Sequence, residues 1–165
     1  MALKRPKGSA GRLVVLAHTS KVLKGNPLGD PHARNVAVWL PPQYDAEEKR
    51  RFPVLYDLVG FTGSGLSHVN WKPFGDNVPE RAARLIHEKK MGPVIIVFPD
   101  CFTALGGNQY VNSSAIGNYA NYLTQEIIPF VDRQFRTLAS REHRGCFGKS
   151  SGGYGAIIHG MKYAR

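Results

Sequence analysis

Four runs of apolar residues recur along the first hundred positions of the chain, at residues 13–16, 36–40, 53–59 and 93–98. The last three end at proline or glycine, which interrupt regular structure. The runs at 53–59 and 93–98 are mostly apolar, and the second of these is rich in β-branched residues. This pattern is typical of strands that are buried on both faces of a parallel sheet.

Two longer segments carry apolar residues at helical spacing instead. Residues 78–90 place them on one face and stop before Gly92, and residues 118–136 repeat them at four-residue steps. Pro129 lies inside the second segment and is expected to kink the helix. The apolar positions are Val78, Ala82, Leu85 and Ile86, followed by Tyr119, Leu123, Ile127 and Val131. Strands that alternate with helices predict an α/β fold, with helices on both faces of one sheet.

Two long connections, residues 61–77 and 101–117, each follow the carboxyl end of a predicted strand. Ligands bind at that end of open α/β sheets, and long loops in a compact domain are often functional. Packed surface loops are the alternative, and the loops alone do not distinguish the two.

The strongest chemical signal is a G-x-S-x-G motif formed by Gly148, Ser150 and Gly152. In this motif the serine lies on a sharp turn between a strand and a helix, and its hydroxyl projects above the sheet. The flanking glycines allow backbones to approach where a Cβ atom would collide. Residues 144–147 can form the strand and residues 156–161 the helix. A glycine-rich turn with a capping serine is the structural alternative.

A phosphate-binding loop is a second alternative, because Gly148-Lys149-Ser150 resembles the end of that motif. The motif requires another glycine five positions before Gly148. His143 occupies that position, so the glycine that opens a phosphate cradle is missing.

A serine nucleophile needs hydrogen-bond donors for the negative charge that develops on the substrate oxygen. In this architecture one donor is the backbone N–H of the residue after the nucleophile, here Ser151. The second comes from the loop after the third strand, and Phe61 is the candidate, because Gly60 frees the backbone to turn. Packing of the Phe61 ring beneath its loop is a structural role that is compatible with the first.

Four stretches resemble the esterase family of the α/β-hydrolases that includes esterase D (S-formylglutathione hydrolase), feruloyl and enterochelin esterases, and mycolyltransferases. They are residues 40–44 (LPPQY), 52–56 (FPVLY), 126–129 (EIIP) and 148–156. Gln43 replaces a glycine of the family pattern. Val59 replaces a histidine that helps to shape the oxyanion loop. The resemblance implies a truncated α/β-hydrolase fold that ends just after the nucleophile turn, and ester or thioester hydrolysis or acyl transfer without a metal or cofactor.

The catalytic triad of this fold follows the order serine, acid, histidine. No acid follows Ser150, and the one downstream histidine is His159. Nine helical residues rise about 13.5 Å, so His159 is expected to be a packed or surface residue.

Two hypotheses follow. The chain is the nucleophile half of an esterase whose acid and base lie elsewhere, or it is a non-catalytic binding domain on the same scaffold. Its partners would be a small ester or thioester, a complementing C-terminal half, or a second copy of the chain.

Composition narrows these hypotheses only slightly. The 165 residues fit one domain at 12–165, after a polar tail at 1–11. Lys and Arg number 22 against 12 Asp and Glu, a net charge of +10, but they are scattered, as on a solvated surface and unlike a nucleic-acid interface. The apolar run after the basic start is too short for a signal peptide, and none is long enough for a membrane span. Two cysteines make no disulfide framework, so a cytoplasmic setting is expected.

Overall fold

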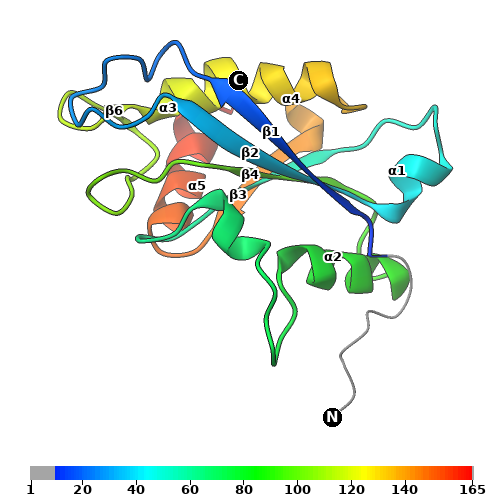
Figure 1. The fold of residues 1–165 in the computed structure, drawn as a ribbon. Helices are drawn as coiled ribbons and strands as arrows, with labels where there is room; N and C mark the ends of the chain where they lie inside the picture. Colours follow the sequence, from blue (N-terminus) through cyan, green and yellow to red (C-terminus); the bar gives the residue numbers. More distant parts are fainter. Residues whose placement is uncertain (1–9, 165) are drawn as a thin grey trace.

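The structure, a computed structural model, describes residues 10–164. Its centre is a five-stranded sheet with the order β1-β2-β4-β3-β7 (Figure 1). The strands are β1 (Arg12–Thr19), β2 (Ala33–Leu40), β3 (Val54–Leu58), β4 (Ile95–Pro99) and β7 (Arg144–Gly148). Only β2 runs against the others, because it pairs antiparallel with both β1 and β4, whereas β3 pairs parallel with β4 and β7. The predicted tail at 1–11 lies outside the described residues, except for Ala10 and Gly11.

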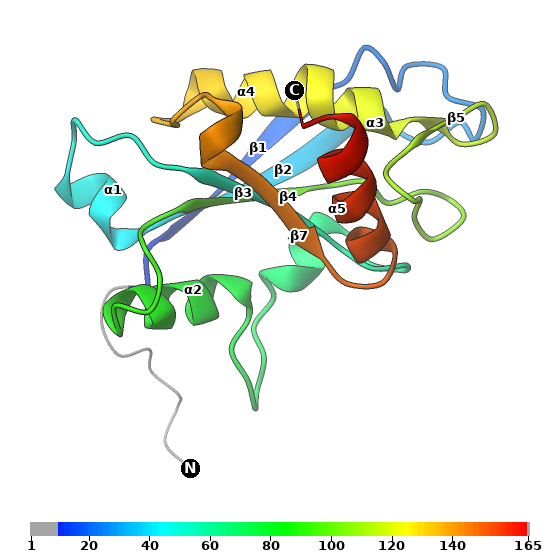
Figure 2. The same cartoon turned by 180° about the vertical axis from the view of Figure 1, so that it is seen from behind.

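Helices cover both faces of the sheet, as the alternation of strands and helices predicts (Figures 1 and 2). Helix α2 (Val78–His87) lies on one face. The other carries a long helix and α5 (Ser151–Lys162). The long helix consists of α3 (Tyr119–Asn121), a π-helical turn (Tyr122–Ile127) and α4 (Ile128–Gln134). Smaller elements complete the fold: α1 (Pro42–Ala46), the 3-10 turns η1 (Gly65–His68) and η3 (Arg141–His143), and the hairpin of β5 (Asn112–Ser113) and β6 (Gly117–Asn118).

The central strands separate two apolar cores. On β4, Ile95 and Val97 contribute to the core beneath the long helix, whereas Ile96 and Phe98 contribute to the core beneath α2. All four are essentially inaccessible to solvent. Because successive strand residues point to opposite faces, a continuous apolar run can supply both cores at once. The prediction of strands buried on both faces is therefore confirmed.

Several boundaries differ from those that apolar runs suggest. β1 and β2 pair over eight residues each, because the backbone ladder continues into polar positions such as Arg34 and Asn35. Helix α5 begins at Ser151 rather than at Ala156. Glycine lowers helix propensity, so the glycine-rich first turn does not read as helix in sequence.

Pro129 is accommodated by a change of helical register. The Ile128 N–H donates to the Leu123 carbonyl, five residues back, and Pro129 then occupies the first turn of α4. Proline has no N–H to donate, and in a regular helix its ring collides with the carbonyl four residues earlier. The wider π-helical turn removes that collision, so the helix continues through the proline.

The carboxylate of Glu126 anchors the turn that follows β1. It accepts hydrogen bonds from the backbone N–H groups of Lys21 (2.7 Å) and Val22 (3.1 Å), and from the Ser20 hydroxyl. Burial alone raises the pKa of Glu126, but these hydrogen bonds outweigh burial, and the net pKa lies below the ordinary 4.5. The charged carboxylate therefore stabilises the folded chain.

Replacing Glu126 with glutamine should lower the free energy of unfolding near neutral pH by about 1–3 kcal/mol, because a charged acceptor is lost. The folded pKa is below the unfolded value, so the wild-type advantage is complete above about pH 5.5 and is lost as the pH falls through the folded pKa. Urea unfolding between about pH 6 and about pH 3 measures both effects. Glu48→Gln, an exposed carboxyl, is the control and should change little. A wild-type advantage undiminished at the acid end would contradict the assignment.

The sheet has an open edge at β7. Among residues 10–164 no strand pairs with the outer side of β7 (Figure 2). Beside it, α5 and the long helix enclose a hollow of about 640 Å³, lined in part by Tyr56, Ile128 and Cys146. Large apolar side chains of this region are exposed: Phe147, Tyr154, Ile157, Met161 and Tyr163.

We expect the isolated chain to form dimers or higher oligomers, or to be poorly soluble, because open edges and bare apolar surface recruit other chains. The net charge of +10 acts against this association. Light scattering is the measurement. The double variant Ile157→Lys with Met161→Lys should shift the chain toward monomer, whereas Phe74→Lys, at an even more exposed position in the loop between η1 and α2, should not. A monodisperse wild-type monomer at high concentration would show that the edge is protected.

Candidate active site

Ser150 occupies the sharp turn between β7 and α5. Its backbone has φ 55° and ψ −122°, a conformation that non-glycine residues seldom adopt and that costs of order 1–3 kcal/mol. The Gly152 N–H donates to the Lys149 carbonyl, and the Tyr154 N–H donates to the Ser150 carbonyl, so the helix begins directly after the serine. Ser150 itself is exposed. The predicted strand-to-helix turn is confirmed.

The two glycines of the motif are required by the end of β3. A methyl group built on Gly152 would lie 1.7 Å from the Leu58 carbonyl oxygen, and one built on Gly148 would lie 2.3 Å from the same atom. Neither distance is compatible with any side chain. The first turn of α5 therefore packs directly on the backbone of β3. This contact fixes the geometry of the turn at Ser150.

The loop after β3 lies against the serine. A methyl group on Gly60 would be 3.6 Å from the Ser150 Cβ and 3.3 Å from the Lys149 carbonyl oxygen. Phe61, the predicted oxyanion donor, follows directly, and its ring lies over Gly106 and Gly107 while remaining 58% exposed. Both the functional and the packing interpretations of Phe61 are compatible with this placement. Ser151, the other predicted donor, is buried at the start of α5.

Residues 101–110 form a second loop that contacts this site. The Thr62 N–H donates to the Gly106 carbonyl at 2.6 Å. The Gln109 side-chain amide donates to the Ser151 hydroxyl at 3.2 Å, and the Tyr110 hydroxyl donates to the Val59 carbonyl at 2.6 Å. The loop therefore touches both the predicted oxyanion loop and the start of α5, although the two are distant in sequence.

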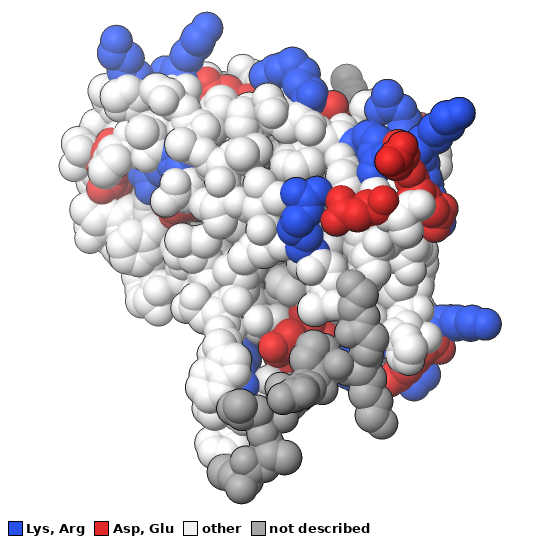
Figure 3. Space-filling model, turned by 45° about the vertical axis from the view of Figure 1, so that its right-hand side comes forward, with Lys and Arg blue, Asp and Glu red and all other residues white. Residues whose placement is uncertain are grey.

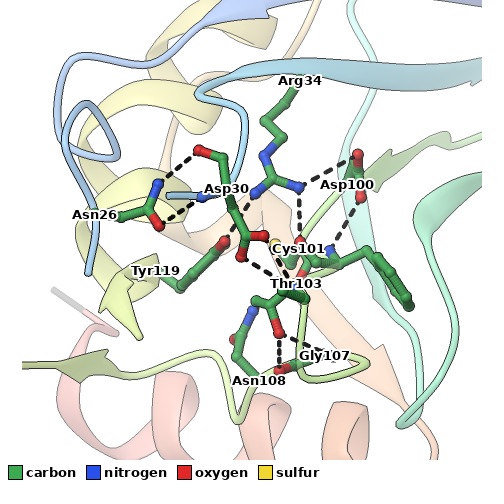
Figure 4. Close-up of polar contacts among 11 residues, drawn as sticks. Asn26, Asp30, Arg34, Asp100, Cys101, Thr103, Gly107, Asn108 and Tyr119 are labelled. Carbon is green, nitrogen blue, oxygen red and sulfur yellow. Dashed lines mark hydrogen bonds and ion pairs between the residues drawn. The ribbon is translucent and has the colours of Figure 1, made fainter. Parts of the chain in front are cut away.

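A buried arginine holds the base of that loop (Figure 4). Arg34 of β2 donates to the Phe102 carbonyl at 2.6 Å and to the Tyr119 hydroxyl at 2.9 Å, and its guanidinium lies 3.7 Å from Asp100. The Asp100 carboxylate also accepts the Phe102 N–H at 3.0 Å. A buried charge is tolerated only when it is paired and hydrogen-bonded. Asp100 thus structures the loop.

The Thr103 hydroxyl closes the turn itself. It donates to the Gly107 carbonyl at 2.7 Å and accepts the Gly107 N–H at 3.2 Å. The Asp30 carboxylate, which lies outside the loop, accepts a hydrogen bond from the Ala104 N–H (Figure 4). Cys101 is buried beneath this network, and burial raises the pKa of its thiol, so it is an unreactive core residue.

An acid–histidine pair lies upstream of the nucleophile. Asp57 of β3 is 1% exposed, and His68 Nδ1 lies 2.7 Å from its Oδ2. The other carboxylate oxygen, Oδ1, is buried without a partner among the described residues. The triad order of the fold argued against an upstream histidine as the base. No local sequence pattern connects Asp57 and His68, because they are eleven positions apart across a loop.

His159 is a packed residue. Its Nε2 lies 2.8 Å from the Tyr110 carbonyl oxygen. Burial lowers the pKa of His159, and the hydrogen bond offsets this only in part. Its contact is with the loop backbone, as expected for a residue nine positions beyond the serine.

The described residues show no group of three or more side chains suited to a metal ion. None of the helices in residues 10–164 is long and apolar enough to cross a membrane. Figure 3 shows basic and acidic side chains interspersed over one face, rather than gathered into a basic patch.

Residues 31–165 match the family model described as "Putative esterase". The chain belongs to this esterase family. It is also 36% identical over 77 residues to esterase Rv1288 of Mycobacterium tuberculosis, a stretch that covers 43% of this chain and 16% of that protein.

Two solved structures share its fold. A ferulic acid esterase superposes with a TM-score of 0.75 at 24% identity, over 93% of this chain and 55% of that one. An S-formylglutathione hydrolase from Agrobacterium tumefaciens superposes with a TM-score of 0.68 at 21% identity, over 94% and 55%. These likenesses establish the α/β-hydrolase fold. The chain spans little more than half the length of either structure.

Replacing Gly152 with alanine should destabilise the chain by about 1–3 kcal/mol or more, because the new methyl group must displace the backbone of β3. Gly160→Ala is a matched control in the same helix, with no neighbouring atom within 4 Å of the added methyl group. It should stabilise α5 by about 1 kcal/mol through helix propensity. Urea unfolding measures both. Equal effects of the two substitutions would show that the contact with Leu58 does not hold the turn.

Proposed function

We propose that the protein is a serine-dependent hydrolase of carboxylic esters or thioesters, with Ser150 as its nucleophile. The observation that carries this proposal is the backbone of Ser150, held at φ 55° by the close packing of α5 on β3. Strained residues persist where the surrounding structure enforces them, and they cluster at functional sites. Membership of the esterase family supports the same chemistry.

In the proposed reaction the Ser150 Oγ attacks the carbonyl carbon of the ester, and a base accepts its proton. The backbone N–H groups of Ser151 and Phe61 stabilise the oxyanion. The tetrahedral intermediate collapses to an acyl-serine, and the alcohol or thiol leaves with a proton. Water then attacks the acyl-serine with help from the same base, which releases the acid and restores the hydroxyl.

The base and its acid partner are proposed to come from a complementing polypeptide segment. His159 is engaged with the Tyr110 carbonyl. The open edge of β7, and the share of the related structures that this chain spans, are compatible with such a segment packing beside α5. The chemistry needs no metal or cofactor. The two free cysteines, Cys101 and Cys146, fit a reducing, cytoplasmic setting.

Purified chain should hydrolyse p-nitrophenyl acetate slowly, and the reaction should depend on Ser150. Without a full triad, about 10³–10⁴ over water is expected from the oxyanion site and binding alone. Ser150→Ala should remove the Ser150-dependent part, and mass spectrometry should locate any acyl adduct on Ser150. An acyl group on another residue, or a rate unchanged by Ser150→Ala, would refute the nucleophile.

Fast turnover that Ser150→Ala abolishes would instead refute the proposal that the base comes from a complementing segment. In that case Asp57→Asn and His68→Gln test the upstream pair. If that pair supplies the base, both substitutions should abolish turnover while Ser150 remains essential.

A further inference from the structure

Tyr110 connects three parts of the candidate site. Its side chain is 3% exposed, and its hydroxyl donates to the Val59 carbonyl at 2.6 Å, just after β3. Its ring lies under α5, where a methyl group on Gly155 would come within 2.6 Å of it. A single side chain from the loop at 101–110 is therefore wedged between the end of β3 and the helix that carries Ser150.

The backbone of Tyr110 is held in an unfavourable conformation by its own hydrogen bonds. Its φ is 60°, a value that a bulky residue adopts only when its surroundings enforce it. The Tyr110 N–H donates to the Asn108 side chain at 2.6 Å, and the Tyr110 carbonyl oxygen lies 2.8 Å from His159 Nε2. Ser150 and Thr62 also have positive φ; Ser150 directly precedes α5, and Thr62 lies three residues after Val59.

The peptide group to which the Tyr110 hydroxyl donates is adjacent to the one that carries the proposed oxyanion donor. The Val59 carbonyl belongs to the Val59–Gly60 peptide, and the following peptide carries the Phe61 N–H. Glycine imposes almost no preference on its own dihedrals, so Gly60 cannot fix the direction of that N–H by itself. The Gly63 N–H donates to the Gly60 carbonyl of that second peptide at 3.1 Å, and the Tyr110 hydroxyl anchors the Val59 carbonyl of the first. Together the two hydrogen bonds limit the rotation about Gly60 that sets the direction of the Phe61 N–H.

We propose that Tyr110 is a positioning residue for the oxyanion site, and that its hydroxyl fixes the Val59–Gly60 peptide so that the Phe61 N–H stays directed toward Ser150. This rests on the proposed function. Burial raises the pKa of Tyr110, so the hydroxyl keeps its proton and remains a donor across the ordinary pH range.

Tyr110→Phe removes the hydroxyl and keeps the ring. Tyr122→Phe is the matched control, because the Tyr122 hydroxyl is also buried but has no hydrogen-bond partner among the described residues. Amide hydrogen exchange should accelerate about tenfold in residues 59–63 of Tyr110→Phe, with the slowest core amides unchanged, and should stay at the wild-type rate in Tyr122→Phe. Ser150-dependent hydrolysis of p-nitrophenyl acetate should fall about tenfold in Tyr110→Phe alone, since a misdirected donor loses part of its effect.

The exchange measurement does not require activity, so it tests the positioning even if Ser150 is not a nucleophile. Unchanged exchange in residues 59–63, or acceleration spread over the whole chain, would overturn the proposal. Accelerated local exchange with an unchanged Ser150-dependent rate would overturn the link to the oxyanion site.

A second pair of variants guards against misfolding of Tyr110→Phe. His159→Gln keeps a donor for the Tyr110 carbonyl and should leave exchange in residues 59–63 as in wild type. His159→Ala removes the donor and should accelerate it in part. Equal exchange in these two variants would contradict the role of the Tyr110 backbone.

Discussion

The contact between α5 and the Leu58 carbonyl determines the geometry of the site. Gly148 and Gly152 both approach this one oxygen more closely than any Cβ atom could. With the helix that close to β3, only Lys149 and Ser150 lie between the end of β7 and the start of α5. Ser150 is forced to positive φ there, and Gly60 lies beside it because β3 ends at the same point. The serine and the loop proposed to stabilise its oxyanion are thus placed by one steric constraint.

The features that the sequence predicted correctly are those with a local steric or periodic cause. The motif at 148–152 is readable because the close approach admits only glycine at its two ends. The buried strands are readable because apolar residues must fill both faces. The predicted start of α5 was wrong by five residues, since Gly152, Gly153 and Gly155 disfavour a helix locally. Gly152 and Gly155 are required by the close approach of Leu58 and Tyr110. At this position tertiary packing determines where the helix begins, and helix propensity carries no information about tertiary packing.

The support of the site could not be predicted, because it depends on residues brought together only by folding. Arg34 is 68 positions from the carbonyl it holds, and Tyr110 is 51 positions from Val59. No spacing rule links such pairs. Asp57 and His68 were each visible, but a histidine before the serine does not fit the triad order of the fold. The roles of Phe61 and Ser151 as donors stay predictions, although Ser151 follows Ser150 directly and Gly60, next to Phe61, lies against Ser150.

The two sides of Ser150 are built differently. Toward β4, buried hydrogen bonds from Arg34, Thr103 and Tyr110 fix the loop at 101–110. Toward the outer edge of β7 lie an open strand and exposed apolar side chains. Burying a guanidinium is costly unless it is paired and hydrogen-bonded. The terminal nitrogens of Arg34 meet this condition through the Phe102 carbonyl, the Tyr119 hydroxyl and Asp100, so they tie the base of the loop to β2. A nucleophile needs its oxyanion donors fixed before the substrate arrives, whereas a base can be brought in from the open side. The loop at 101–110 bonds to Thr62, next to Phe61, and to the Ser151 hydroxyl, so the anchored side of Ser150 is the one that supports the proposed donors.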